Sequence, residues 1–360
     1  MKRSDNVSRT VLLLMLLGFY MPAISAEEKT AEPKEEVNES PWLLTPLVSS
    51  SPKFGTSIGA MAGYLHKFDK ESPTSTFSLM GSYSDSDSLF YGLFGRTFFD
   101  HDRQRLIAGV VNGEVNNNYK DFLGTGVPVN TTDDFSAIFL RYQHVITGNW
   151  YFGPQFLSTD YAISGNDWFS NELINRLGLT GFDSNGIGLL VERDTRDNQN
   201  SPAQGALFNV NNIAYRKSLG GSSSFDAYAL KFSRFFAHGG GNVLAARIEG
   251  RWTNDAPTAG YSTVPLRGYT MGQYLAPHMS MIEVEERYKL PGRWGLTGFT
   301  GVACLYGGDD ECFDSDNIYP TIGFGATYMI KLEEKMVIRT EVAKGVGENY
   351  GFYLKFGYEF

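Results

Sequence analysis

The sequence predicts an all-β fold, a transmembrane antiparallel β-barrel, and three observations lead to this class. The last residues of the chain alternate between apolar and polar side chains, as a strand with one apolar face does. Aromatic residues make up 14% of the chain and 40 residues are glycine, yet the mean hydropathy is slightly polar, as in a barrel wall that averages lipid-facing and lumen-facing residues. No stretch beyond the amino terminus reaches the roughly 20 apolar residues of a membrane helix. A secreted β-sandwich or propeller is the alternative.

The amino terminus is typical of a secretory signal peptide, expected over residues 1–26. Basic residues precede an apolar stretch that is too short to span a bilayer as a permanent helix, and small residues follow it. These features are, in order, Lys2, Arg3 and Arg9, the stretch 11–19, and Ala23, Ser25 and Ala26. Residues 27–41 are acidic and polar and contain proline, which indicates a disordered periplasmic lead-in. The barrel is then expected over residues 42–360.

Amphipathic segments separated by turn signals follow through the rest of the chain and predict fifteen strands. Because single-chain bacterial barrels have even strand numbers, a sixteenth strand is expected. Residues 42–50 are the favoured first strand, and a strand within 164–184 is the alternative. The fifteen other strands are expected at 54–67, 74–83, 88–99, 104–115, 133–147, 149–163, 185–194, 205–218, 224–237, 242–253, 279–290, 294–305, 318–331, 335–346 and 350–360.

Turn lengths assign the two ends of the barrel, because short turns face the periplasm and long loops face outward in barrels of this kind. When the first strand is 42–50, short and long connections alternate along the chain, which favours sixteen strands. The short connections are 147–149, 239–241, 291–293 and 332–334. The long connections are 116–132, 164–184, 254–278 and 306–317.

Charged residues on the later strands share one face of each strand. An Arg or Lys on the lipid face at mid-bilayer costs roughly 2–4 kcal/mol, so these charges are expected to point into a wet lumen. On the strand 279–290, for example, Ile282, Val284 and Tyr288 occupy the opposite, lipid-facing side. The inward-facing charges are expected to be Arg247, Glu249, Arg251, Glu283, Glu285, Arg287, Lys289, Arg339 and Glu341.

The final strand ends in an aromatic residue, and its apolar face is expected to hold Phe352, Leu354, Phe356, Tyr358 and Phe360. A strand that ends in Phe resembles the terminal signal by which Gram-negative bacteria recognise unfolded outer-membrane barrels. Phe356, Tyr358 and Phe360 would form that signal here, and the barrel-assembly machinery of the cell would insert the chain. The expected location is therefore the outer membrane of a Gram-negative bacterium, with its lipid as a partner.

The net charge, the cysteines and the histidines narrow the classes of function and partner. The formal net charge of −9 argues against nucleic acid as a partner. Cys304 and Cys312 are the two cysteines of the chain, and in an oxidising compartment a disulfide across a surface loop is expected, with two unpaired thiols as the alternative. The five histidines are scattered without metal-ligand spacing, so no metal, no cofactor and no enzymatic activity are expected.

Two motifs lie on connections of the predicted barrel. The sequence LRGY occupies 266–269 in a long connection, and DTRDN at 194–198 precedes SP at 201–202 near a strand start. These motifs, in this order and with the terminal Phe, resemble the BamA/TamA superfamily of outer-membrane barrels, the bacterial surface antigen family. LRGY resembles the VRGF-type motif of its sixth extracellular loop, and DTRDN its periplasmic turn between strands eight and nine. A weaker similarity lies at 122–126, and the resemblance covers roughly 54–360.

The resemblance implies a sixteen-stranded barrel whose sixth loop folds into the lumen, where the arginine of its motif pairs with acidic residues of the inner wall. By match, that arginine is Arg267, followed by Gly268 and Tyr269. A guanidinium in a narrow wet lumen would seek carboxylates, and Glu283 and Glu285 on the next strand are the first candidates. An exposed loop residue beside a glycine turn is the alternative reading of the arginine.

Two departures qualify the resemblance. The position of the family's usual acidic partner holds Thr300, which leaves Glu283 and Glu285, with Glu249 and Glu341 nearby in the sheet. Relatives carry periplasmic POTRA modules ahead of the barrel, whereas 27–41 is too short for one, so the chain resembles the short, barrel-only branch lacking POTRA modules.

In the periplasmic turn, the side chains of Asp194, Arg196 and Asp197 are expected to stabilise the turn itself, because short polar side chains there cap backbone amides. A ligand role is not implied by the resemblance.

The function that the resemblance implies is assistance with the insertion or translocation of proteins or lipids at the outer membrane. A weakly paired seam between the first and last strands would open and template an incoming strand. Pro46 suits such an edge, because proline cannot donate to a strand ladder. Client proteins or a separately encoded periplasmic module would be partners. The alternative is a self-contained passive pore or structural outer-membrane barrel.

Overall fold

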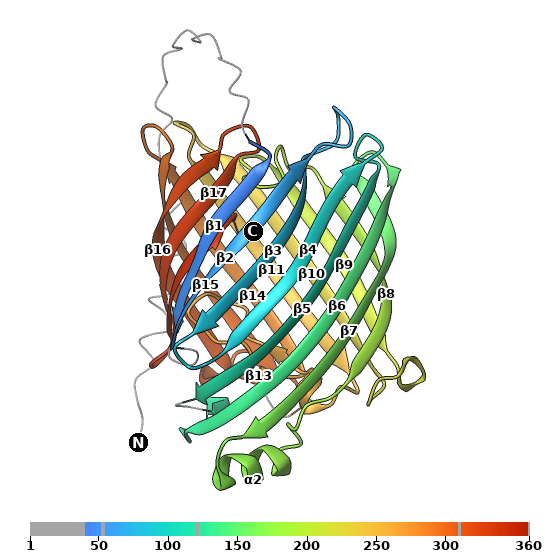
Figure 1. Ribbon diagram of the computed structural model, residues 1–360, viewed down its shortest axis with the longest axis vertical. Coiled ribbons are helices and arrows are strands. Elements are labelled where there is room, and N and C mark those ends of the chain that lie inside the picture. Colours follow the sequence, from blue (N-terminus) through green and yellow to red (C-terminus); the bar gives the residue numbers. More distant parts are fainter. Residues whose placement is uncertain (1–39, 52–54, 120–121, 125, 309–310, 359–360) are drawn as a thin grey trace. The chain divides into compact units, whose positions relative to one another are not determined.

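The computed structural model describes residues 40–51, 55–119, 122–124, 126–308 and 311–358, and these form a closed barrel (Figure 1). Of the eighteen strands in this part of the chain, two form a separate sheet, so sixteen close the barrel. Neighbouring barrel strands pair antiparallel throughout, which confirms the predicted fold class. The expected signal peptide, most of the expected lead-in and the terminal Phe360 lie outside the described residues.

The barrel strands follow one another around the ring in chain order, and the last closes it against the first. They are β1 (Trp42–Ser51), β2 (Gly55–His66), β3 (Ser75–Ser84), β4 (Leu89–Phe99), β5 (Gln104–Tyr119), β6 (Val129–Thr147), β7 (Trp150–Gly165), β8 (Ser184–Asp194), β9 (Gly205–Tyr215), β10 (Phe225–Ala237), β11 (Val243–Asn254), β14 (His278–Lys289), β15 (Trp294–Tyr306), β16 (Ile318–Lys331), β17 (Met336–Lys344) and β18 (Tyr350–Phe356). The separate sheet joins β12 (Ser262–Thr263) and β13 (Leu275–Ala276). The helices are η1 (Phe122–Gly124), α2 (Trp168–Arg176), η2 (Lys217–Leu219), η3 (Thr258–Gly260) and η4 (Ser315–Asn317). Within the described ranges, no helix is long and apolar enough to cross a membrane.

The first strand is β1, which pairs with β2 at ten positions and confirms the favoured assignment of 42–50. The alternative region, 164–184, instead holds α2. Its amino end is capped by Asp167, whose side chain accepts a hydrogen bond from the Ser170 N–H at 2.8 Å. α2 and the connection between β11 and β14 lie at one end of the barrel, the lower end in Figure 1. We call this the long-loop end, and the opposite end the short-turn end.

The hairpin of β5 and β6 is longer than predicted. The connection was expected over 116–132, yet β5 continues to Tyr119 and β6 begins at Val129. Asparagine favours turns, and the run of asparagines therefore placed the predicted strand ends too early. In the barrel, the Asn117 side-chain amide donates to Thr131 Oγ1 at 2.9 Å. Such cross-strand side-chain hydrogen bonds extend the hairpin beyond the rest of the wall.

Alternation separates an apolar outer face from a polar inner face. On β14, Ile282 and Tyr288 are 39% and 52% exposed, whereas Glu283 and Glu285 are fully buried at 0%. Large apolar side chains are exposed on many of the other strands too, so the outer surface has the character of a lipid-facing wall. The prediction that the strand charges point inward is confirmed for the buried ones, which are Arg247, Glu283, Glu285, Arg287, Arg339 and Glu341. Lys289, at the end of β14, is exposed.

The closing seam between β1 and β18 is the shortest pairing of the barrel. In the described residues these two strands are in register at three positions, from Val48 opposite Leu354 to Ser50 opposite Phe352. Every other barrel pair has between seven and sixteen such positions. Pro46 lies in the part of β1 that pairs with β2 but not with β18.

The carboxyl end departs from the predicted strand 350–360. β18 ends at Phe356, whose side chain is partly buried, and Gly357 adopts a φ of +78°, a left-handed conformation that turns the chain. The ring of Tyr358 then lies 3.7 Å from the guanidinium carbon of Arg287, on the inner face of β14. The prediction that Tyr358 continues the lipid-facing side of the strand is therefore wrong, because the inward turn places its ring against a cation.

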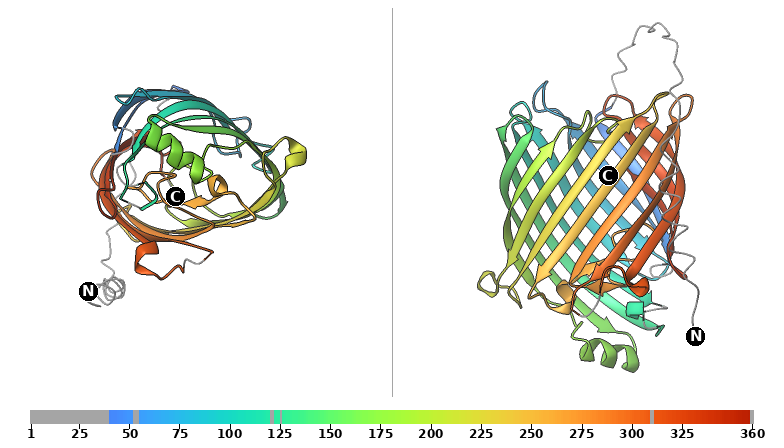
Figure 2. Two further views of the ribbon diagram at one scale, coloured as in Figure 1. Left: turned by 90° about the horizontal axis from the view of Figure 1, so that it is seen from below. Right: turned by 180° about the vertical axis from the view of Figure 1, so that it is seen from behind.

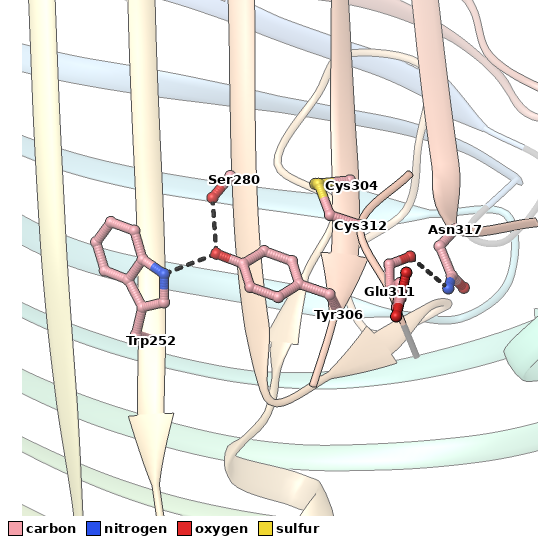
Figure 3. Close-up of a disulfide and its surroundings, with 7 residues drawn as sticks. All are labelled: Trp252, Ser280, Cys304, Tyr306, Glu311, Cys312 and Asn317. Carbon is pink, nitrogen blue, oxygen red and sulfur yellow. Dashed lines mark hydrogen bonds between the residues drawn. A yellow bond between two sulfur atoms is a disulfide. The ribbon is translucent and has the colours of Figure 1, made fainter. Parts of the chain in front are cut away.

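Cys304 on β15 and Cys312 in the loop that follows form a disulfide, with Cα atoms 5.2 Å apart (Figure 3). Beside it, the Tyr306 hydroxyl accepts a hydrogen bond from the indole N–H of Trp252 at 2.7 Å and lies 3.0 Å from Ser280 Oγ. These contacts join β11, β14 and β15 where the loop begins. The disulfide therefore anchors the loop to a firmly connected part of the wall.

Replacing both cysteines by serine should free this loop without opening the barrel, because the crosslink joins residues only eight positions apart and no strand pairing depends on it. We expect the double variant to keep its heat-modifiable mobility in gels and to be cut faster by chymotrypsin at Phe313, which is 90% exposed. Wild-type protein treated with a reductant is the matched control and should be cut at the same raised rate. Equal cleavage of the oxidised wild type and the double variant would contradict this role.

Candidate functional site

The connection between β11 and β14, residues 255–277, packs against the inner wall of the barrel. Seen along the barrel in Figure 2, this orange segment lies within the ring of strands. Its apolar side chains share a buried cluster with residues of β14 and β15. The cluster contains Val264, Leu266, Tyr269, Ala276, Met279, Met281, Ala303 and Leu305. Burial of these side chains holds the segment to the wall, and its central residue is Arg267.

Arg267 is 4% exposed and contacts three carboxylates on the inner wall. Its Nη2 lies 2.6 Å from Glu283 Oε1, and its Nη1 lies 2.8 Å from Glu285 Oε2 and 2.9 Å from Glu341 Oε1. The ring of Phe299 covers one face of the guanidinium, 3.4 Å from the guanidinium carbon to the ring centroid. One side chain of the loop is thus bound by β14, β15 and β17 at once.

Each of these glutamates also contacts a second arginine from the wall. Glu283 pairs with Arg247 at 2.6 Å, Glu285 with Arg287 at 2.8 Å, and Glu341 with Arg339 at 3.2 Å. We call these six residues, together with Arg267, the Arg267 network; it holds four arginines and three glutamates. Buried charges are tolerated when each is paired and hydrogen-bonded, and here opposite charges alternate through the network.

Gly268 allows the chain to pass close to the wall. Its φ of +96° is a conformation that other residues rarely adopt, and an added Cβ would lie 3.2 Å from the Gly345 nitrogen. Its N–H donates to the Tyr353 hydroxyl on β18 at 3.1 Å. The preceding carbonyl, that of Arg267, accepts from Thr321 Oγ1 at 2.5 Å. The backbone of the motif is therefore tied to β16 and β18.

Tyr269 completes the attachment of the motif. Its hydroxyl donates to the Pro320 carbonyl at 2.7 Å and accepts from the Val346 N–H at 2.9 Å. Its ring lies edge-on to Tyr319 with centroids 5.8 Å apart. A Cβ on Gly345 would lie 2.6 Å from the Tyr269 ring, so a glycine is needed there for the ring to fit. Arg267, Gly268 and Tyr269 thus contact five consecutive strands of the ring, from β14 to β18.

Two sequence-based details need adjustment. Thr300 does not face the network; its hydroxyl donates to the Thr321 carbonyl at 3.0 Å, and the inward neighbour Phe299 lies under Arg267 instead. Glu249, considered as a nearby carboxylate, pairs with Lys231 at 3.3 Å and with Arg247 at 3.4 Å. The sequence did not predict the contact of Phe299 with Arg267, because this contact depends on where the loop lies in the folded barrel.

The turn motif at 194–198 forms a second ionic cluster. Asp194 is buried and pairs with Arg196 at 2.9 Å and with Arg105 of β5 at 3.0 Å. The Asp197 side chain accepts hydrogen bonds from the N–H groups of Ala203 and Gln204 at 2.8 and 3.1 Å. The structure thus places Asp197 as a cap of backbone amides and Arg196 as an ion-pair partner within the turn. Arg105 has no motif around it, and sequence reasoning missed it.

The same turn, residues 195–204, reaches across the short-turn end of the barrel. Asn200 Oδ1 accepts from Arg96 of β4 at 2.9 Å, and Asn200 Nδ2 donates to the Glu334 carbonyl between β16 and β17 at 2.9 Å. The Pro202 carbonyl accepts from Arg287 of β14 at 3.2 Å. These partners belong to well-separated parts of the ring. The turn therefore spans the interior of the barrel. The length of the turn alone does not predict these contacts.

Comparison with known proteins identifies the fold. No family model matches the sequence, and no curated protein sequence matches it. A structure of BamA from Haemophilus ducreyi lacking POTRA domains 1–3 matches with a TM-score of 0.55 at 11% identity, over 99% of this chain and 80% of that chain. CdiB from Acinetobacter baumannii matches with a TM-score of 0.58 at 13% identity, over 89% of this chain and 60% of that one. CdiB from Escherichia coli gives 0.56 at 10% identity, over 91% of this chain and 63% of that one.

The chain thus has the barrel fold of these solved proteins, and it spans less than two thirds of the length of either CdiB chain. The barrel also agrees with the resemblance to the BamA/TamA superfamily that the motifs indicate, and the agreement is one of fold.

Arg267→Ala should release the segment 255–277 and leave the strands folded, because each glutamate of the network keeps a second arginine. We expect a loss of about 3 kcal/mol in the free energy of unfolding, the lower end of the range for a broken buried ion pair. Urea unfolding in lipid vesicles would measure this loss, and chymotrypsin cleavage near Tyr269 and Tyr274 would report the release.

The matched control is Arg176→Ala on α2, which breaks an exposed pair with Glu172 and should cost less than about 1 kcal/mol. Equal losses in the two variants, with Tyr269 still resistant to protease, would show that Arg267 does not hold the segment.

Proposed function

We propose that this barrel lies in the outer membrane of a Gram-negative bacterium and assists the insertion or translocation of proteins or lipids there. The fold shared with BamA and CdiB barrels supports the general kind of function. The observation that carries the mechanism is the closing seam, where β1 and β18 are in register at three positions. Client proteins, or a separately encoded periplasmic module, would be its partners.

The seam offers an edge on which another strand can pair. β1 is paired with β2 along its whole length, while its other edge, among the residues that the structure describes, is paired with β18 from Val48 to Ser50. The edge from Trp42 to Leu47 therefore presents N–H and C=O groups that an incoming strand could bind by β-augmentation. Pro46 interrupts this edge and discourages permanent pairing, because it lacks a donor.

The seam should resist opening less than the other barrel pairs, which have seven to sixteen registered positions in the described residues. A backbone hydrogen bond contributes about 0.5–1.5 kcal/mol net, and unpaired groups in lipid cost more. Three registered positions therefore oppose opening by only a few kcal/mol. A pair such as β5 and β6, with sixteen positions, would resist opening several times more strongly.

The contacts of Gly268 and Tyr269 suggest which strand would move. Gly268 is bonded to Tyr353 of β18, and Tyr269 to the neighbouring β16 and to the loop before β18. β18 is thus tied to the filled interior, whereas β1 is held by β2, by the short seam and by the apolar cluster that Leu43 shares with Met336 of β17. We infer that β1 and β2 swing away from β18 when the seam opens.

A passive pore is the second candidate, because a cavity of 640 Å³ lies in the lumen. The segment 255–277 and the turn 195–204 both contribute side chains to its wall. A pore closed from both directions in this way would conduct poorly, which favours the first proposal.

Closing the seam covalently tests the proposal. Val48→Cys with Leu354→Cys places two thiols at a registered pair of the seam. Photoreactive residues placed nearby, at Ser50 or Phe352, would report adducts with nascent barrel proteins or a periplasmic carrier in cells. We expect such adducts in the reduced pair and at least a tenfold loss in the oxidised pair, because a crosslinked edge admits no new strand.

The matched control pair is Ile58→Cys with Tyr83→Cys between β2 and β3, which are also registered, outward-facing and apolar. Oxidation of this pair should leave the adducts unchanged. Adducts only within the barrel or to lipid, in either pair, would refute the proposal and favour a self-contained pore or structural barrel.

A further inference from the structure

The lumen cavity lies in the half of the barrel that the Arg267 network does not fill. Its wall is formed mainly by strands from β4 to β11, with Met279 of β14 at its edge. Arg196 and Gln199 of the turn 195–204 line it from one side, and Thr263 and Met271 of the segment 255–277 from the other. At 640 Å³ it falls within the range of about 300–1,000 Å³ that holds small organic ligands.

The charges on the cavity wall are unbalanced. Two carboxylates line it, those of Glu192 and Glu249. Six cationic side chains line it, those of Arg96, Arg105, Arg141, Arg196, Lys231 and Arg251. Six minus two leaves a formal excess of four positive charges. This contrasts with the Arg267 network, where four arginines face three glutamates.

Half of the cationic side chains have carboxylate partners. Arg105 and Arg196 both pair with Asp194, at 3.0 and 2.9 Å, and Lys231 pairs with Glu249 at 3.3 Å. The excess charge is therefore concentrated on the remaining three, Arg96, Arg141 and Arg251.

In the described part of the chain, the hydrogen bonds of these three arginines go to neutral acceptors. Arg96 donates to the Asn200 side chain at 2.9 Å. Arg141 donates to the Gln155 carbonyl oxygen at 2.8 and 3.1 Å. Arg251 donates to Ser262 Oγ at 3.0 Å and to a backbone carbonyl at 3.1 Å. Each guanidinium has five N–H donors, so each keeps donors to spare.

Gln143 adds an unused donor to the same wall. Its side chain is 1% exposed and lines the cavity between Arg105 and Arg141 in the sheet. Its amide nitrogen has no hydrogen-bond partner among the described residues. Buried polar groups are normally paired, so an orphaned donor in the same cavity wall as three guanidiniums without carboxylate partners indicates a wall suited to an acceptor-rich group.

We infer that the lumen cavity binds an anionic ligand that carries a phosphate group. Like charges on Arg96, Arg141 and Arg251 repel one another in a partly desolvated space, and an anion relieves this repulsion. Guanidinium forks match phosphate oxygens in geometry, and a phosphate has enough oxygens to accept from several arginines. The cavity is larger than a free phosphate needs, so the ligand is a phosphate ester, either of a small water-soluble molecule or of a lipid headgroup.

Calorimetry on the purified full-length barrel in an uncharged detergent tests this inference. The probes are glycerol 3-phosphate and dihexanoyl phosphatidic acid, a short-chain lipid. Wild type should bind at least one of them. Arg141→Gln and Arg251→Gln, on opposite parts of the wall, should each weaken binding about tenfold, which corresponds to about 1.4 kcal/mol. Tighter binding of the lipid assigns a headgroup; similar binding of both probes assigns a soluble ester.

Arg176→Gln on α2 is the matched control, since it removes the same charge from an exposed site and should bind like wild type. Heat-modifiable mobility in gels verifies that each variant is folded. If one of the two wall variants fails to fold, the other still tests the inference. Absence of binding to wild type at millimolar probe, or equal affinity of the folded wall variants and wild type, would overturn the inference.

Discussion

The interior of this barrel depends on one guanidinium held by three carboxylates. Arg267 is the only cation that the segment 255–277 brings into the network, and it meets Glu283, Glu285 and Glu341 from two strands. Arg267 fixes the position of this long connection, because its planar guanidinium binds several carboxylates in one geometry. Apolar burial around Leu266 then adds to this attachment.

The position of that segment divides the lumen into two unlike parts. On the side of β14 to β18, charges are nearly balanced and the space is filled. On the side of β4 to β11, arginines without carboxylate partners surround a cavity that the turn 195–204 and the segment 255–277 both line. The two connections enter from opposite ends, and ion pairs hold each of them. Asp194 pairs with Arg105 and Arg196 in the turn, and Arg267 pairs with the wall glutamates in the segment. Charge is thus segregated across the lumen.

Closure of the wall follows a different constraint. In lipid, unpaired backbone groups are costly, so a barrel pairs its strands all round. In the described residues the pairing of β1 with β18 meets this requirement at three positions, and every other barrel pair meets it at seven or more. The short β18 and the inward turn at Gly357 both shorten the seam. A wall whose weakest pairing is its closing seam can open there without unfolding.

The sequence by itself determined the fold class, the number of strands, the face on which charges lie, and the arginine of the loop motif. These follow from local alternation and from short motifs, and alternation fixes which side of a strand each residue faces. Only the tertiary structure decided that Phe299 covers Arg267, that Asn200 reaches Arg96, and that Tyr358 turns toward Arg287. Those contacts join strands distant in sequence. They depend on how the barrel is staggered and closed, which no local pattern specifies.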